Sequence, residues 1–160
     1  MSVSQLVAAV LSVTAATLPQ PDAVAIAIAA AVEDTRTALG RGGEGMTLVE
    51  LGSWAGTAQE KAAAVNQIIG KLPGPARPGE YANDVRCKVG GACEIVAGET
   101  FVRVDSTRVR DGALAVFIAT VSVVTRASAA SALCTRDYSI DVLRAEGGWA
   151  LARMELTRTC

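Results

Sequence analysis

The sequence of 160 residues contains no histidine. Serine and cysteine nucleophiles are usually activated by a histidine, so its absence excludes Ser-His-Asp and Cys-His catalysis. It also removes the commonest metal ligand and the side chain that most often titrates near neutral pH. Any catalysis would have to use other groups, such as a carboxylate and a tyrosine.

An excess of positive charge is also missing, and aromatic residues are scarce. Fifteen basic residues stand against sixteen acidic ones, and only 4% of the residues are aromatic. Proteins that bind nucleic acids need positive charge for the phosphates, and many use aromatic rings to stack the bases. The composition therefore gives no reason to expect a nucleic-acid partner.

The four cysteines, Cys87, Cys93, Cys134 and Cys160, form neither a C-x-x-C redox motif nor the short paired spacing of a zinc site. Their even number favours two structural disulfides, which form in exported proteins. A metal site fits the spacing poorly, and reduced core cysteines in a cytosolic chain are the other alternative. We expect no metal and no cofactor.

The N-terminus contains an apolar run of the size found in signal peptides, residues 6–18, but no Lys or Arg precedes it. The run is too short to span a bilayer, so we expect no stable membrane span. We interpret residues 1–18 as a signal peptide or an apolar N-terminal segment of the fold, and residues 19–160 as a single domain. With the disulfides, this predicts a periplasmic or secreted bacterial protein.

The end of the chain reads as a β-hairpin around a three-residue glycine loop, Glu146-Gly147-Gly148. A slip of one residue would mix its apolar and polar faces, so the pattern specifies the register. The same register places Cys134 opposite Cys160 and predicts a disulfide between them. The expected pairs are Ala145–Trp149, Val142–Ala152, Ile140–Met154, Tyr138–Leu156, Leu143–Leu151, Asp141–Arg153, Ser139–Glu155 and Asp137–Thr157.

Two helices precede the strands. The first is expected to start with Asp22 as its N-cap and to end at Gly40, and the second starts at a capping box formed by Thr57 and Glu60. Residues 40–45 spell G-x-G-x-x-G, but a helix precedes this loop and a strand follows it. Dinucleotide binding needs the reverse order, so we reject that interpretation.

From Val85 onward the pattern is β. A turn at Val89-Gly90-Gly91 would place Cys87 opposite Cys93, and Asp111-Gly112 predicts another hairpin between strands 101–109 and 113–125. Helices followed by antiparallel strands predict an α+β fold, with the N-terminal helices packed on one face of a curved antiparallel sheet.

The C-terminal residues Tyr138-Ser139-Ile140-Asp141-Val142 and Gly147-Gly148-Trp149-Ala150-Leu151 resemble the last two strands of the NTF2-like (cystatin-like) α+β cone. The resemblance implies an NTF2-like roll with a place for a cone-shaped pocket. Because that superfamily contains both enzymes and non-catalytic binding proteins, it implies no particular function.

Tyr138 is the first candidate site residue. Some NTF2-like isomerases stabilise an enolate with a tyrosine and a carboxylic acid of raised pKa. Asp105 is the carboxylate expected to face inward, because it shares a predicted strand face with Phe101. In the alternative interpretation, Tyr138 is a core tyrosine with a satisfied hydroxyl group, and Asp105 pairs with a neighbouring arginine.

Arg136 opposite Arg158 is the second candidate, since two like charges in direct register would be relieved by a bound anion. Two arginines that extend into water are the alternative. Trp54, between Gly52 and Gly56, is a candidate for the mouth of a pocket, or it packs at the end of an element. The polar outer face of the last hairpin is expected to be solvated or to contact a partner.

Together these features predict a small exported, disulfide-stabilised, non-catalytic domain that binds a ligand or another protein. The partner would be a small anionic or apolar ligand or an envelope protein. The alternatives are an acid–base isomerase or dehydratase with a carboxylate and Tyr138 in a cone-shaped pocket, and an accessory domain of an envelope assembly. Both pocket hypotheses fail if the covered sheet face is filled by Ile68, Ile69, Phe117 and Tyr138.

Overall fold

The computed structural model describes residues 20–40, 45–52, 56–89, 93–96, 98–110, 116–126 and 132–160. Five features of the sequence fall wholly or partly outside the described residues: the expected signal peptide, the centre of the G-x-G-x-x-G loop, Trp54, the Val89-Gly90-Gly91 turn and the Asp111-Gly112 turn. The signal peptide and the role of Trp54 therefore stay predictions.

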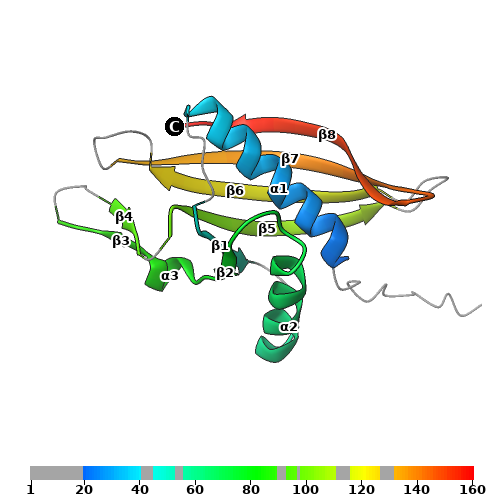
Figure 1. Ribbon diagram of the computed structural model, residues 1–160, viewed down its shortest axis with the longest axis horizontal. Helices are drawn as coiled ribbons and strands as arrows, with labels where there is room; N and C mark the ends of the chain where they lie inside the picture. Colours follow the sequence, from blue (N-terminus) through cyan, green and yellow to red (C-terminus); the bar gives the residue numbers. More distant parts are fainter. Residues whose placement is uncertain are drawn as a thin grey trace, which may run out of the picture.

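The chain forms a mostly antiparallel six-stranded sheet with one long helix across it (Figure 1). The strand order is β2-β1-β5-β6-β7-β8; β1 is parallel to β2 and β5, and the other neighbours are antiparallel. The expected α+β class is thereby confirmed. The elements are α1 (Pro21–Ala38), β1 (Thr47–Leu51), α2 (Ala58–Ile69), β2 (Ala76–Pro78), α3 (Tyr81–Asp84), β3 (Val85–Cys87), β4 (Cys93–Ile95), β5 (Thr100–Arg110), β6 (Val116–Arg126), β7 (Leu133–Ala145) and β8 (Gly148–Arg158).

Helix α1 begins two residues earlier than expected. Gln20 is the N-cap, and Pro21 occupies the first turn, where its missing N–H is not needed. Asp22 lies in that first turn, where its charge favours the helix dipole. The helix ends at Ala38, with Leu39 as its C-cap, and the expected Gly40 follows with a φ of +63°, which suits glycine. Helix α2 begins with the expected capping box of Thr57 and Glu60, and the N–H of Thr57 lowers the pKa of the Glu60 carboxyl.

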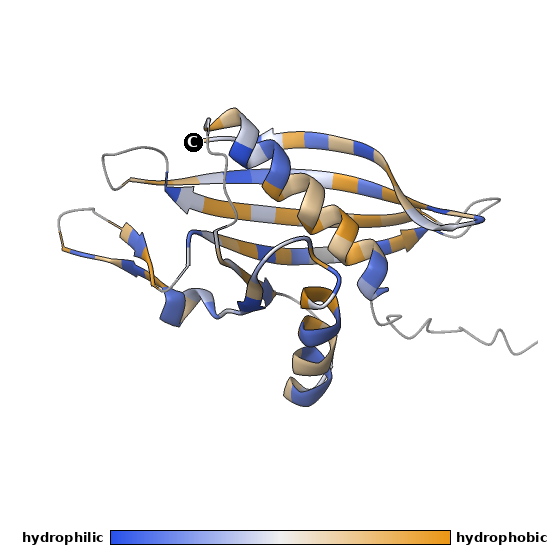
Figure 2. Ribbon diagram, in the orientation of Figure 1, coloured by the Kyte–Doolittle hydropathy of each residue, from blue (hydrophilic) through white to orange (hydrophobic). Residues whose placement is uncertain are grey.

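The face of the sheet that α1 covers is filled with side chains. Ile28 of α1, Ile68 of α2, Phe117 of β6 and Tyr138 of β7 are fully buried there, and Ile69 packs against them. Buried residues alternate with less buried ones along most of β6 and β7, both of which carry hydrophobic segments in Figure 2, so one side of each strand packs into this core. The cone-shaped pocket that both pocket hypotheses require is therefore filled in the described part of the chain.

A β-bulge interrupts β5. The register with β6 shifts between Val104 and Ser106, so that Asp105 is the extra residue. Thr107 and Val109 are consequently paired with the helix-side residues of β6, whereas Phe101 lies on the other side and packs in a small second cluster with Leu48, Val85, Ile95 and Val124. In a regular strand Phe101 and Val109 would share a face, but they lie on opposite faces here, because alternation along a strand fails at a bulge.

The last hairpin keeps its expected register only in the middle. Four pairs are confirmed: Tyr138–Leu156, Ser139–Glu155, Ile140–Met154 and Asp141–Arg153. The loop is shorter than expected, because Ala145 pairs with Gly148, whose φ is +125°. The predicted pairs Ala145–Trp149, Val142–Ala152, Leu143–Leu151 and Asp137–Thr157 are wrong, since Ala152 and Thr157 are extra residues in β8.

Both expected disulfides are present. Cys87 and Cys93 are directly paired in β3 and β4, with 4.0 Å between their Cα atoms. Cys134, which is fully buried, joins β7 to Cys160 just beyond β8, with a Cα separation of 5.3 Å. No cysteine is free. Each bond ties one end of a hairpin and restricts the unfolded chain, which supports a structural role.

Candidate functional site

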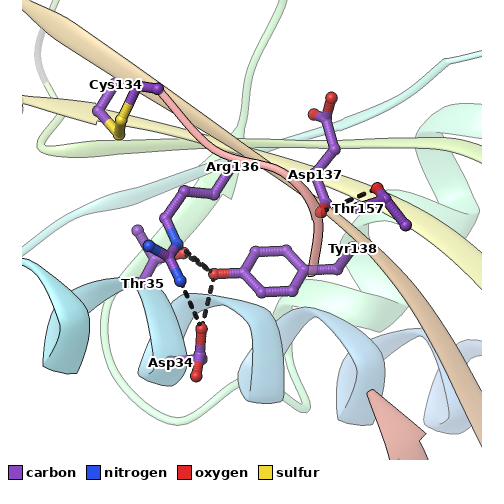
Figure 3. A network of polar contacts seen from close by, with 8 residues as sticks. Asp34, Thr35, Cys134, Arg136, Asp137, Tyr138 and Thr157 are labelled. Atoms are coloured by element: carbon purple, nitrogen blue, oxygen red, sulfur yellow. Dashed lines mark hydrogen bonds and ion pairs between the residues drawn. A yellow bond between two sulfur atoms is a disulfide. The ribbon is translucent and has the colours of Figure 1, made fainter. Parts of the chain in front are cut away.

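Tyr138 lies at the centre of a polar network between α1 and β7 (Figure 3). Its hydroxyl oxygen is 2.7 Å from Thr35 Oγ1, 2.9 Å from Asp34 Oδ2 and 2.8 Å from Arg136 Nε. Arg136 Nη2 also donates to Asp34 Oδ2 at 3.1 Å. Arg136 and Tyr138 are two residues apart on β7 and share its helix-side face, and Asp34 and Thr35 lie in the last turns of α1.

The network satisfies the tyrosine completely. The hydroxyl donates its proton to Asp34 and accepts from Arg136, which leaves Thr35 to donate to the remaining lone pair. Burial raises the pKa of Tyr138 above its ordinary value, so the phenol is neutral near pH 7. The bond to Tyr138, together with Asp34, raises the pKa of Arg136. Tyr138 therefore has no free lone pair or proton to offer a substrate.

Asp105 and Tyr138 do not form a common site. Asp105 accepts a hydrogen bond from Ser122 Oγ at 2.9 Å and pairs with Arg103 Nε at 2.7 Å. The cross-strand partner of Tyr138 is Val121, the neighbour of Ser122 on β6, and consecutive residues of a strand point to opposite faces. The carboxylate and the phenol required by the isomerase hypothesis thus lie on opposite sides of the sheet.

Arg136 and Arg158 do not face each other, so the expected like-charge pair is wrong. Because Thr157 is an extra residue, Arg158 moves into register with Asp137, and its Nε lies 2.9 Å from Asp137 Oδ2. Arg136 points to the other face, where it pairs with Asp34. Each arginine already has a carboxylate partner, which removes the reason to expect an anion between them.

The side of the sheet away from α1 carries a polar row across five strands. Its residues follow one another in register from β1 to β8, and acidic and basic charges alternate. Glu50 Oε2, Arg103 Nε and Asp137 Oδ1 are buried and make no hydrogen bond, although each of these side chains belongs to an ion pair. No group of three or more acidic or cysteine side chains in the described segments is placed to hold a metal ion. The members of the row are Glu50, Arg103, Ser122, Asp137 and Arg158.

A cavity of about 320 Å³ lies between α1, the start of β1 and the loop before β2. Ile28, Val32 and Leu72 form apolar walls, while Glu33 and Arg36 supply one charge of each sign. Arg36 Nη2 donates to the carbonyl oxygen of Gly45 at 3.1 Å. This volume is at the lower limit for ligand pockets, which span roughly 300–1,000 Å³. The cavity has room for a small apolar molecule with a polar end.

Strand β8 forms one edge of the sheet along 11 residues, whereas β2 forms the other edge along three. Leu151, Met154 and Leu156 of β8 are paired with helix-side residues of β7, so they lie on the same side as α1. Leu151 is 47% exposed and Leu156 is 41% exposed. We call these three side chains, with the unpaired main-chain groups of β8, the edge surface.

Sequence reasoning missed two features of these sites. Nothing in the sequence identified Asp34 as the partner of Arg136, because 102 residues separate them. The position of β8 at the edge of the sheet could not be predicted either, because the pattern of a hairpin does not indicate whether another strand pairs with the far side of its second strand. Its apolar side chains were assigned to packing, and only their exposure shows otherwise.

Among the described residues, none of the helices combines the length and apolarity needed to cross a bilayer. No protein family, curated protein or solved structure matches this chain.

Proposed function

We propose that the chain is an exported, non-catalytic domain of NTF2-like architecture that binds another protein through the edge surface of β8. The observation that carries this proposal is the combination of a long unpaired strand edge with two large, half-exposed leucines, Leu151 and Leu156. Proteins usually shorten, cover or charge such an edge, because its free N–H and C=O groups pair readily with another chain.

The two edges of the sheet support this interpretation. Strand β2 is three residues long and ends in Pro78, which cannot donate a hydrogen bond to a further strand. Strand β8 has no proline, and it offers both main-chain groups and apolar side chains to a partner. Addition of a strand to an open edge combines main-chain hydrogen bonds with side-chain contacts, and is a common way to bind an extended segment.

The arrangement of the polar residues favours binding over catalysis. Tyr138 is closed in by its three partners, and Asp105 lies on the opposite face. The two disulfides support export to the periplasm or the cell exterior, where such bonds persist. The order of helices and strands supports the NTF2-like assignment.

Site-specific photocrosslinking tests the proposal in cells of the organism that encodes the protein. Benzoylphenylalanine replaces Leu156 in one variant and the exposed Gln67 of α2 in a matched control. After irradiation we expect a discrete adduct of higher mass from position 156 and none from position 67. Equal labelling at both positions, or no adduct at position 156, would contradict the proposal.

A further inference from the structure

We propose that the edge surface pairs with the edge surface of a second copy, so that two β8 strands join antiparallel about a two-fold axis at Met154. This inference rests on the proposed function, because it names the partner of the same surface. It would join the two six-stranded sheets into one continuous sheet with an α1 helix from each copy on the same side.

The two-fold axis restricts the possible registers. An axis perpendicular to the sheet keeps the α1 side of one copy on the α1 side of the other. Directly opposed residues must then point to the same side, so the axis passes through a residue and not between two residues. The stretch of β8 between its two extra residues runs from Arg153 to Leu156, which leaves few choices for this central residue.

Charge selects Met154 among them. Arg153 and Glu155 lie on the side away from α1, and Arg153 Nη2 is 2.6 Å from Glu155 Oε2 within one strand. With Met154 at the axis, each Arg153 lies opposite the Glu155 of the other copy, which gives two opposite-charge pairs. An axis at Arg153 would oppose two arginines, and one at Glu155 would oppose two glutamates, both of which are unfavourable. An axis at Leu156 would oppose Glu155 to the neutral Thr157, which gives no opposite-charge pair.

The apolar side chains agree with the same register. Met154 meets its own copy at the axis, and Leu156 lies next to Ala152, the small extra residue at which the regular stretch ends. The exposed parts of Leu151 and Leu156 from both copies would thus be covered on the α1 side. One further charge lies beside the ion pairs within each copy: Asp141 is in register with Arg153, whereas the neutral Ser139 is in register with Glu155.

Analytical ultracentrifugation of the disulfide-bonded protein tests the pairing through a charge exchange. We expect the wild-type protein to be a dimer. Arg153→Glu and Glu155→Arg should each weaken the dimer by about tenfold or more, because each substitution creates two like-charge pairs. The double variant, Arg153→Glu with Glu155→Arg, should restore the affinity, and Arg110→Glu, on the exposed end of β5, should leave it unchanged.

A covalent test does not depend on the affinity of charge variants or on their folding. In the variant Met154→Cys the two new thiols would meet at the axis, where directly opposed Cα atoms are about 4.5–5.5 Å apart and can form a disulfide. We expect an intermolecular disulfide in this variant and none in Ala150→Cys. A monomeric wild-type protein, a double variant that stays weak, or equal crosslinking at positions 154 and 150 would overturn the pairing.

The photocrosslinking experiment separates the two proposals. An adduct of position 156 with a second copy supports both. An adduct with a different protein, together with a monomeric chain in the ultracentrifuge, overturns the self-pairing but supports the proposed function. The absence of any adduct at position 156 contradicts the proposed function and, with a monomeric chain, the self-pairing as well.

Discussion

The α1-covered face of the sheet and the free edge of β8 both carry large apolar side chains, which are buried on the face and partly exposed on the edge. On the covered face, Phe117 and Tyr138 are fully buried, and the one buried phenol has three hydrogen-bond partners. On the edge, Leu151 and Leu156 are about half exposed, and no further strand of the described segments lies beside the main chain of β8. The side chains named on the covered face are packed and hydrogen-bonded within the chain, whereas those on the edge leave apolar surface exposed.

The difference shows how a buried polar residue should be judged in a chain of unknown activity. A tyrosine next to an aspartate and an arginine resembles the beginning of a catalytic site, and perturbed pKa values often mark such sites. Here the hydrogen bonds of Tyr138 are used up by the fold, so the raised pKa reports burial. The unsatisfied surface is apolar and lies elsewhere, which favours association over chemistry.

The largest expected effect on stability comes from truncating one apolar side chain in the core, and the matched truncation on the edge should have a much smaller effect. Phe117→Ala should lower the free energy of unfolding by about 3–5 kcal/mol, because it removes a fully buried ring and leaves a cavity. Leu151→Ala, at a half-exposed position, should lower it by less than about 1 kcal/mol in the monomer. Urea unfolding at a concentration where the chain is monomeric measures both. Similar losses for the two variants would show that the edge is packed like the core.

An intermediate effect is expected from the two arginines of the last hairpin, which sequence reasoning treated as equivalent. Arg136→Gln should cost about 1–3 kcal/mol of unfolding free energy, because Asp34 and the buried Tyr138 hydroxyl lose a charged donor. Arg158 is 71% exposed, so the loss of its pair with Asp137 in Arg158→Gln should change stability by less than about 0.5 kcal/mol.

Thermal and urea unfolding of both arginine variants check this difference. The same experiments, repeated with added phosphate or a carboxylate, test the abandoned anion site. An anion-dependent stabilisation that disappears only when both arginines are replaced would restore that hypothesis.

The central register of the last hairpin could be predicted because two independent patterns agree there. Alternation of apolar and polar residues fixed the pairs from Tyr138 to Asp141, and the cysteine positions agreed with them. The ends of the hairpin could not be predicted. Ala152 and Thr157 carry no signature of a bulge, and a bulge in an edge strand depends on twist and on the packing of α1 above it.

The candidate site was less predictable than the fold. Tyr138 was correctly expected on the helix side, and its interpretation as a core tyrosine with a satisfied hydroxyl is confirmed. Its partners Asp34 and Thr35 come from a helix whose rotation over the sheet depends on the whole core. Asp105 was misplaced because Phe101, whose face of the strand it shares, packs in the second cluster on the side of the sheet away from α1.

A smaller effect than that of Arg136→Gln, but a more specific one, is expected from Tyr138→Phe, which keeps the ring and removes the hydroxyl. At neutral pH it should cost about 1 kcal/mol for the lost hydrogen bonds, measured by urea unfolding. The pKa of Tyr138 is higher in the folded chain than in the unfolded chain, where it is about 10. The stability that the hydroxyl contributes is therefore fully present below about pH 10, and it is lost as the pH rises through the pKa of Tyr138 in the folded chain. The other tyrosine, Tyr81, is present in both the wild-type protein and Tyr138→Phe, so it does not contribute to the difference between them.

The difference in stability between the wild-type protein and Tyr138→Phe should therefore narrow above about pH 10, where only the wild-type chain can release this proton on unfolding. Arg136→Gln is the informative companion. The guanidinium of Arg136 stabilises the phenolate of Tyr138, so removing it should raise the pKa of Tyr138 in the folded chain further. Stability curves that stay parallel from pH 8 to pH 11 would mean that solvent reaches the hydroxyl, and the network would then be open enough to receive a ligand.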